Sequence, residues 1–124
     1  MKIFKVGLIG NGKMGKIYTS EIKKNRNFKI INILDHKNLK RKPELIKKFF
    51  NSKKINLIVI SSPIKTHFKY LEYAYEAKKN IIVEKPLVEK INQLKKLKKL
   101  KKNYKQKVMI HHNDVLNFEK LNFM

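Results

Sequence analysis

Five short apolar runs are spread along the chain, each rich in Val, Ile or Leu and each followed by polar residues. A run of this length and composition predicts a buried strand of a parallel sheet, because both faces of such a strand lie against helices. We therefore expect five buried strands. They lie at Val6–Ile9, Phe28–Leu34, Leu57–Ile60, Ile81–Val83 and Val108–Ile110.

Two longer segments between these runs carry apolar residues at intervals of three and four, with lysines on the opposite side. This spacing predicts helices that bury one stripe each. The stripes are Met14, Ile17, Tyr18 and Ile22 in the first segment, and His67, Tyr70, Leu71, Ala74 and Tyr75 in the second. Ser62 and Pro63 fit an N-cap followed by a first helical residue, so we expect the second helix to begin there.

Strands that alternate with helices predict an α/β fold with a doubly wound, parallel, Rossmann-type sheet. The stretch from Leu34 to Leu57 is short for such a fold, since it contains one convincing helix, roughly residues 43–50, and no clear strand. We therefore expect a reduced sheet of order 2-1-4-5-6, in which the third strand is missing or vestigial.

The chain has 124 residues, enough for one domain, and a formal net charge of +22. Such a charge is typical of proteins that bind nucleic acid. However, the basic residues are 29 lysines and 2 arginines, and Lys, Ile and Asn together account for 58 residues. Codons for these three residues are rich in A and T, so a biased genome explains the charge as well. A polycationic nucleic-acid-binding module on a reused Rossmann fold remains the alternative hypothesis.

Other features of the sequence bear on where the protein is located in the cell and on which chemistry it can perform. The segment Leu94–Lys102 repeats leucine every third residue, which fits an outer helix with a lysine face, or alternatively a helix on a membrane surface. No apolar run is long enough to span a membrane, and the N-terminus lacks the pattern of a signal peptide. The absence of cysteine excludes disulfides and thiol chemistry and fits a cytoplasmic protein.

The first chemical motif is a glycine-rich turn of the form G-x-G-x-x-G, which follows a predicted strand and opens a predicted helix. In a dinucleotide site, the first glycine makes the tight turn, the second lets the backbone approach the pyrophosphate, and the third lets the helix pack closely. The predicted cofactor contacts here are Gly10, Asn11, Gly12, Lys13, Met14 and Gly15.

Asp35 lies 20 residues after Gly15, at the end of the second predicted strand. A carboxylate in this place accepts hydrogen bonds from the adenosine ribose and repels a 2′-phosphate, so NAD is favoured over NADP. His36 and Lys37 follow directly and soften that preference. Lys13 and Lys37 are further candidates for contacts to phosphate.

A second constellation follows the third and fourth predicted strands, as Ser61-Ser62-Pro63 with His67 and then Glu84-Lys85-Pro86. Together with the glycine turn and its Met14, these segments resemble the cofactor domain of the Gfo/Idh/MocA oxidoreductases. That family carries G-x-G-x-M-G, T-P-x-x-x-H and E-K-P in the same order, and the similarity covers nearly the whole chain. Ser62 stands where the family has Thr.

The resemblance implies an NAD(P)-dependent oxidoreductase that transfers hydride at a carbon bearing a hydroxyl of a sugar, inositol or nucleotide sugar. It implies that Lys85 is catalytic and reaches the substrate hydroxyl beside the nicotinamide. Glu84 and Ser62 would line the nicotinamide half of the site, and Pro63 would shape the turn beneath it. Ser61 is a further expected cofactor contact, and the Lys85–Pro86 bond is expected to be cis. His67 fits either a cofactor contact or a histidine packed at the start of a helix.

The chain also departs from the family. Lys78 occupies a position where the family commonly has Gly, and His111-His112 with Asp114 replaces the family's Asn and Arg-Phe pair. We do not expect a metal there, because adjacent residues of a strand point to opposite faces. Residues 1–124 are expected to form the dinucleotide-binding domain, ending where the substrate domain of the family would begin, so that catalysis by this chain alone is doubtful.

Overall fold

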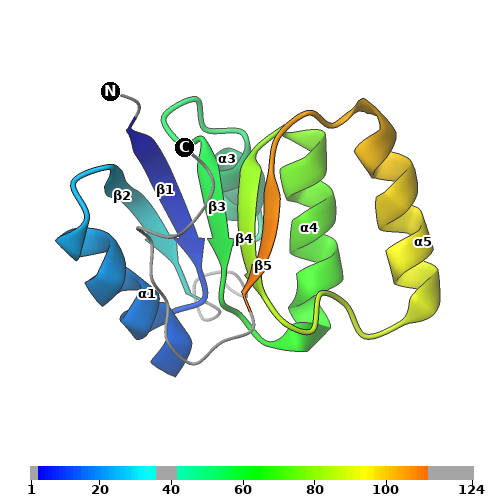
Figure 1. The fold of residues 1–124 in the computed structure, drawn as a ribbon, viewed down its shortest axis with the longest axis horizontal. Coiled ribbons are helices and arrows are strands. Elements are labelled where there is room, and N and C mark those ends of the chain that lie inside the picture. Colours follow the sequence, from blue (N-terminus) through cyan, green and yellow to red (C-terminus); the bar gives the residue numbers. More distant parts are fainter. Residues whose placement is uncertain (1–2, 36–41, 112–124) are drawn as a thin grey trace.

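One parallel, five-stranded sheet in the order β2-β1-β3-β4-β5 forms the centre of the computed structural model, which describes residues 3–35 and 42–111 (Figure 1). The strands are β1 (Phe4–Ile9), β2 (Phe28–Leu34), β3 (Leu57–Ile60), β4 (Asn80–Glu84) and β5 (Val108–His111). The reduced order predicted from the sequence is confirmed. In the described part of the chain between β2 and β3, the only regular element is a helix, α3.

Helices cover both faces of this sheet, so the fold is doubly wound. Helix α1 (Lys13–Lys24) lies on one face, and α3 (Glu44–Phe50), α4 (His67–Glu76) and α5 (Ile91–Leu100) lie on the other (Figure 1). Two short 3₁₀ helices flank them, η1 (Ile64–Thr66) before α4 and η2 (Lys101–Asn103) after α5. None of the helices in the described ranges is both long enough and apolar enough to cross a membrane.

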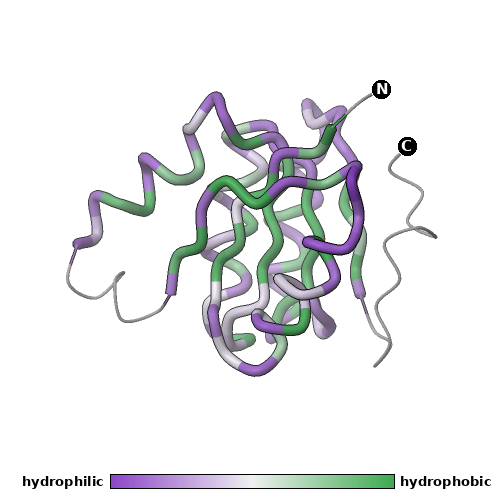
Figure 2. Tube along the Cα trace, turned by 90° about the vertical axis from the view of Figure 1, so that its left-hand side faces the viewer, coloured by the Kyte–Doolittle hydropathy of each residue, from purple (hydrophilic) through white to green (hydrophobic). Residues whose placement is uncertain are grey.

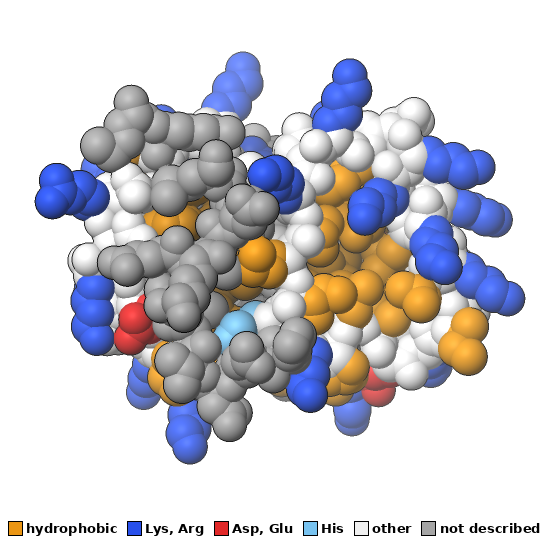
Figure 3. Space-filling model, viewed as in Figure 1, with side chains coloured by type: hydrophobic (Ala, Val, Ile, Leu, Met, Phe, Trp, Pro, Cys, Tyr) orange, Lys and Arg blue, Asp and Glu red, His pale blue; other side chains and the backbone are white. Residues whose placement is uncertain are grey.

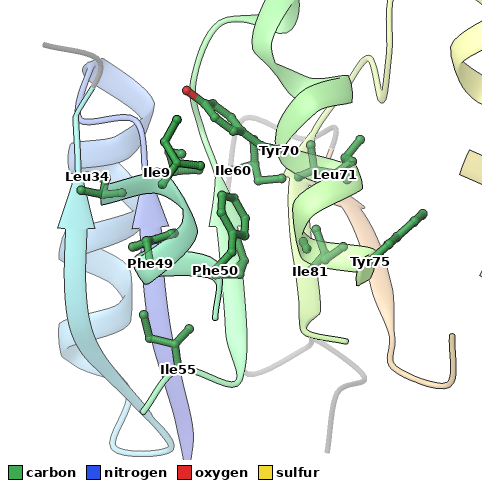
Figure 4. Close-up of a cluster of buried hydrophobic side chains, with 14 of the residues drawn as sticks. Ile9, Leu34, Phe49, Phe50, Ile55, Ile60, Tyr70, Leu71, Tyr75 and Ile81 are labelled. Atoms are coloured by element: carbon green, nitrogen blue, oxygen red, sulfur yellow. The ribbon is translucent and has the colours of Figure 1, made fainter. Parts of the chain in front are cut away.

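Side chains of the strands alternate between two hydrophobic clusters, as the pleat of a sheet requires. In β3, Leu57 and Val59 belong to the cluster beneath α1, whereas Ile58 and Ile60 belong to the cluster beneath α3, α4 and α5. The second cluster is the larger, and Phe50 lies near its centre, stacked on Tyr70 (Figure 4). Hydrophobic residues accordingly line the central strands, and hydrophilic ones interrupt them along the outer helices (Figure 2).

The strand runs read from the sequence are confirmed, with small extensions at their ends. β1 begins two residues earlier than expected, at Phe4. The Phe4 amide donates a hydrogen bond to the Asn27 carbonyl at 2.8 Å, and its ring stacks on Phe28 with centroids 5.3 Å apart. This aromatic pair fixes the amino ends of the two strands beside each other, which the pattern of each run alone does not show.

The predicted start of the second helix is wrong. Pro63 has an extended backbone, with ψ at 148°, and the chain passes through η1 before α4 begins at His67. The Ser62 hydroxyl pairs with the Thr66 hydroxyl at 2.7 Å and does not cap a backbone amide. The pattern Ser-Pro fits both a helix start and an extended turn, and here contacts from distant residues select the turn.

Lys78 has a φ of 56° in the turn between α4 and β4. The family commonly has glycine at this position, and the structure shows why, because the turn places this residue in the left-handed region. Its backbone amide donates to the Tyr75 carbonyl at 3.1 Å, which helps to close the end of α4. A lysine adopts this conformation at some cost in free energy, because its Cβ crowds the backbone.

Candidate functional site

A cavity of about 700 Å³ opens at the carboxyl ends of the central strands, where parallel α/β sheets hold their ligands. It extends from the glycine turn after β1 to the turn after β4. Its lining residues come from four separate connections and from the first turns of α1 and α4. They are Gly10, Asn11, Gly12, Met14, Lys16, Asp35, Ser61, Ser62, Pro63, Ile64, His67, Glu84 and Lys85.

Two glycines of the turn are required by the packing of the protein itself. Gly10 has a φ of +102°, and a Cβ there would lie 2.6 Å from the Ser62 amide nitrogen. A Cβ on Gly15 would collide with the Gly10 carbonyl oxygen. These contacts hold the start of α1 tightly against the ends of β1 and β3.

Gly12 differs, because no heavy atom of residues 3–35 and 42–111 lies within 4 Å of the place where its Cβ would be. Its φ of −82° suits any residue, so neither the packing of these residues nor the backbone conformation explains a glycine there. The bare backbone instead leaves room beside the cavity. A cofactor whose phosphates approach the main chain would use that room, so this turn fits a dinucleotide.

The N-terminus of α1 faces the same turn. Within the described part of the chain it has no side-chain cap, and its first turn holds no acidic residue. The amide of Lys16 is the first to bond within the helix, to the Gly12 carbonyl at 3.0 Å. The preceding amides and the helix dipole therefore favour an anion at this point. The Lys16 side chain lines the cavity and adds positive charge.

Ser61 and Leu34 connect the glycine turn to its neighbours. The Ser61 hydroxyl lies 2.8 Å from the Gly10 carbonyl oxygen and 3.2 Å from that of Ile9. The Gly10 amide donates to the Leu34 carbonyl at 2.8 Å, which brings the end of β2 against the turn. Asp35, the next residue, thereby lines the cavity at the end opposite Lys85.

The segment after β4 contains the other candidate chemistry. The Lys85–Pro86 bond is cis, as expected from the resemblance. The Lys85 amide donates to the His111 carbonyl at 2.9 Å, while its side chain is exposed at the edge of the cavity. Burial raises the pKa of the Glu84 carboxyl above its ordinary 4.5, and the nearby His111 and His67 partly oppose that rise.

Tyr18 connects α1 to the end of β5. Its hydroxyl lies 3.0 Å from the His111 Nδ1, although 93 positions separate the two residues. Burial, and to a smaller extent the charge of Glu84, raises the pKa of the Tyr18 hydroxyl, so it stays neutral and can donate to the imidazole. The bond helps to hold β5 beside the site.

His67, only 2% exposed, connects the two turns that follow β3 and β4. Its Nε2 lies 2.9 Å from the Ser62 carbonyl oxygen and its Nδ1 lies 3.0 Å from the Pro86 carbonyl oxygen. Both ring nitrogens are therefore engaged by the backbone. The ring lines the cavity without offering a free hydrogen-bonding atom to it.

Comparison with known proteins agrees with this geometry. Residues 4–112 match the family model of the GFO_IDH_MocA oxidoreductases, described as an oxidoreductase family with an NAD-binding Rossmann fold. The chain belongs to the Gfo/Idh/MocA family. The match includes every strand of the sheet and the whole glycine turn, so this is an NAD-binding Rossmann domain.

Individual relatives are much longer than this chain. The uncharacterized oxidoreductase YdgJ of Escherichia coli (strain K12) is 34% identical over 67 residues, which are 54% of this chain and 19% of YdgJ. A crystal structure of a candidate oxidoreductase from Bacteroides fragilis has a TM-score of 0.76 and 29% identity, and the match covers 90% of this chain and 38% of that one. Apo scyllo-inositol dehydrogenase from Lactobacillus casei shares the fold, with a TM-score of 0.75, 24% identity and coverage of 88% and 36%.

The structure brings together most of the residues that the family motifs predict. Lys13 and Gly15 do not line the cavity, because Lys13 points to solvent and Gly15 packs against the turn. Sequence reasoning missed Lys16 and Ile64, which do line it. Lys16 follows Gly12 by one helical turn, and that spacing is the signal that identifies it.

Four residues that the sequence analysis named lie outside the described residues. They are His36 and Lys37, which bear on the choice between NAD and NADP, and His112 and Asp114. Only His111 of the histidine pair is described. Within residues 3–35 and 42–111, no group of three His, Asp or Glu side chains is placed to hold a metal ion.

Proposed function

We propose that this domain binds NAD with the adenosine at Asp35, the pyrophosphate at the glycine turn and the nicotinamide between Ser62, Glu84 and Lys85. The observation that carries the proposal is the open space beside Gly12, for which the packing of the described residues gives no reason. The cavity that adjoins it runs from Asp35 to Lys85 and is large enough for a substantial ligand.

The choice of NAD over NADP rests on Asp35. Its carboxylate lines the cavity at the end of β2, where it would accept hydrogen bonds from the ribose hydroxyls. A 2′-phosphate in the same place would bring like charges together, which disfavours NADP. Lys16 lines the cavity nearer the glycine turn and suits the pyrophosphate instead.

Bound NAD would supply the hydride acceptor, and the residues after β4 would prepare the substrate. Lys85 is exposed at the rim of the cavity, so its ammonium can contact a substrate hydroxyl and hold a proton at Nζ. Glu84 lies deeper, with a raised pKa, and contributes a carboxyl beside the nicotinamide half. Lys85 is accordingly the proposed catalytic residue.

The proposed substrate is a hydroxyl of a sugar, an inositol or a nucleotide sugar, as the family resemblance implies. Residues 1–124 would supply the cofactor domain of such an enzyme. The chain spans 38% or less of the relatives described above. We propose that a further domain of the kind present in longer relatives presents the substrate to Lys85. This domain would then bind the cofactor by itself but not the substrate.

A calorimetric titration of the purified domain with NAD and with NADP tests this proposal. We expect saturable binding of NAD and weaker binding of NADP. Asp35→Ser should weaken NAD binding roughly tenfold, the value of a charge-assisted hydrogen bond, and reduce the preference for NAD. Glu44→Gln removes a carboxylate outside the cavity and should change neither affinity. No binding of either dinucleotide at millimolar concentration would contradict the proposal.

A further inference from the structure

His67 has an unusual set of hydrogen-bond partners for a buried histidine. Both of its ring nitrogens lie at hydrogen-bond distance from backbone carbonyl oxygens, at 2.9 Å from Ser62 and at 3.0 Å from Pro86. A carbonyl oxygen can only accept a hydrogen bond. Each ring nitrogen must therefore carry a proton for both bonds to form.

A neutral imidazole satisfies only one of these contacts, because one of its nitrogens has a lone pair and no proton. That lone pair would then face a carbonyl oxygen at about 3 Å, on a side chain that is only 2% exposed to water. Such an unmatched buried contact is costly. The geometry thus suits the imidazolium, which has two donors on opposite sides of the ring.

Charged groups of both signs lie around the ring. Among the described residues, the end of β4 contributes Glu84, whose carboxyl interacts electrostatically with both His67 and His111. Lys85 follows it at the rim of the cavity, and Lys65 belongs to the turn that precedes the ring. The Glu84 carboxylate favours the charged ring, whereas the two lysines oppose it, so the case for the imidazolium rests on its two hydrogen-bond donors.

We infer that His67 is a positioning residue, held as an imidazolium, which fixes the turn carrying Lys85 against the turn carrying Ser62. It acts through two backbone carbonyls and does not need to touch the cofactor. One carbonyl belongs to the residue directly after Lys85, so the orientation of that lysine depends on the ring. This inference rests on the proposed function only in that Lys85 is taken to face the substrate.

Nitrogen-15 NMR of the imidazole rings in the whole chain tests the inference without any cofactor. We expect both nitrogens of His67 to carry protons at pH 7. His67→Gln, which lacks the ring, identifies its signals. A ring with one unprotonated nitrogen at pH 7 in the folded protein would overturn the inference. An NAD titration of the same sample tests the proposed function separately, since the protonation result stands whether or not NAD binds.

Amide hydrogen exchange, corrected for intrinsic rates, gives a second readout of the positioning role. His67→Phe keeps a ring without donors, and we expect exchange at Lys85, Leu87 and Val88 to accelerate roughly tenfold or more relative to wild type. The glycine turn should keep its wild-type rates. Acceleration confined to the first turn of α4, with no change after β4, would show a merely local role and contradict the inference. If His67→Phe does not fold, the wild-type NMR result decides.

Discussion

At the scale of single residues, backbone conformation separates two kinds of position in this domain. Gly10 needs to be glycine because of its positive φ and its contact with Ser62, whereas Gly12 needs to be glycine only if a ligand is bound. Lys78 is the opposite case, since it occupies a left-handed position without being glycine. Each of these residues gives a measurable consequence.

Lys78→Gly should stabilise the fold. The positive φ of 56° strains a lysine and suits glycine, and the gain should be about 1 kcal/mol, less the larger entropy of glycine in the unfolded chain. Urea unfolding followed by circular dichroism measures the change. Lys69→Gly in the first turn of α4 is the matched control, and it should destabilise by up to about 1 kcal/mol. Equal losses in the two variants would contradict this account of Lys78.

The sequence predicted the positions of residues well where the cause is local. A strained turn requires glycine, so the motif identified Gly10 and Gly15, and a strand end placed Asp35. It failed at Ser62 and Pro63, because the geometry of that turn depends on His67 and through it on Pro86, which lies 19 positions further on. A local capping pattern contains no information about such a partner.

At the scale of elements, the helices differ in how firmly the core holds them. Helix α4 buries five residues against the sheet, whereas α5 buries Leu97 alone and turns its lysines to solvent. The outer edge formed by β5 and α5 also exposes Ile91, Leu94 and Ile110. Hydrophobic side chains gather there in the space-filling view (Figure 3). The expected outer helix with a lysine face is confirmed.

Leu97 is the one fully buried residue of α5, and Leu100 is only partly buried against the core, so Leu97→Ala should destabilise the domain by about 2–4 kcal/mol through the cavity it leaves. Leu94→Ala, on the same helix but 37% exposed, should cost below about 1 kcal/mol. Thermal unfolding followed by circular dichroism compares the two variants. Similar losses at both positions would show that α5 is held by something other than the Leu97 contact.

The elements themselves were predictable because each strand is a β-branched run and each helix has one apolar stripe. The order of the sheet followed from the short connection between β2 and β3. The extension of β1 to Phe4 was not predictable, since it depends on Phe28 of another strand. Ile64 was likewise missed, because which side chains face a cavity depends on how separate turns meet, whereas the spacing of Lys16 from Gly12 was a signal that went unused.

At the scale of the whole molecule, the basic charge is spread widely and the tyrosines are concentrated in the core. Lysines project from many sides of the surface in Figure 3. Binding to nucleic acid stays a prediction of the alternative hypothesis, and a steep loss of affinity with salt would be its sign. The tyrosines give a firmer consequence for stability.

Alkaline pH should unfold the domain. Burial raises the pKa of Tyr18, Tyr70, Tyr75 and Tyr104 above the ordinary 10.0. Their contribution to stability is therefore complete below pH 10 and is lost as the pH rises towards the folded-state values. The pKa of Lys79 is lowered by burial and acts in the opposite direction, but it is a single group. Thermal melts between pH 8 and 11, with tyrosinate absorbance, should show cooperative unfolding above pH 10, and a constant melting temperature would contradict this.

The central claim is that the glycine turn exists to hold a dinucleotide, and Gly12→Val tests it most directly. A side chain there meets open space among the described residues, so the unfolding free energy should stay within about 1 kcal/mol of wild type, while NAD affinity falls to below a tenth. Gly10→Val should lose folding and binding together. Calorimetric titration of folded Gly12→Val with NAD gives the answer: loss of binding in a stable protein supports the claim, and wild-type affinity contradicts it.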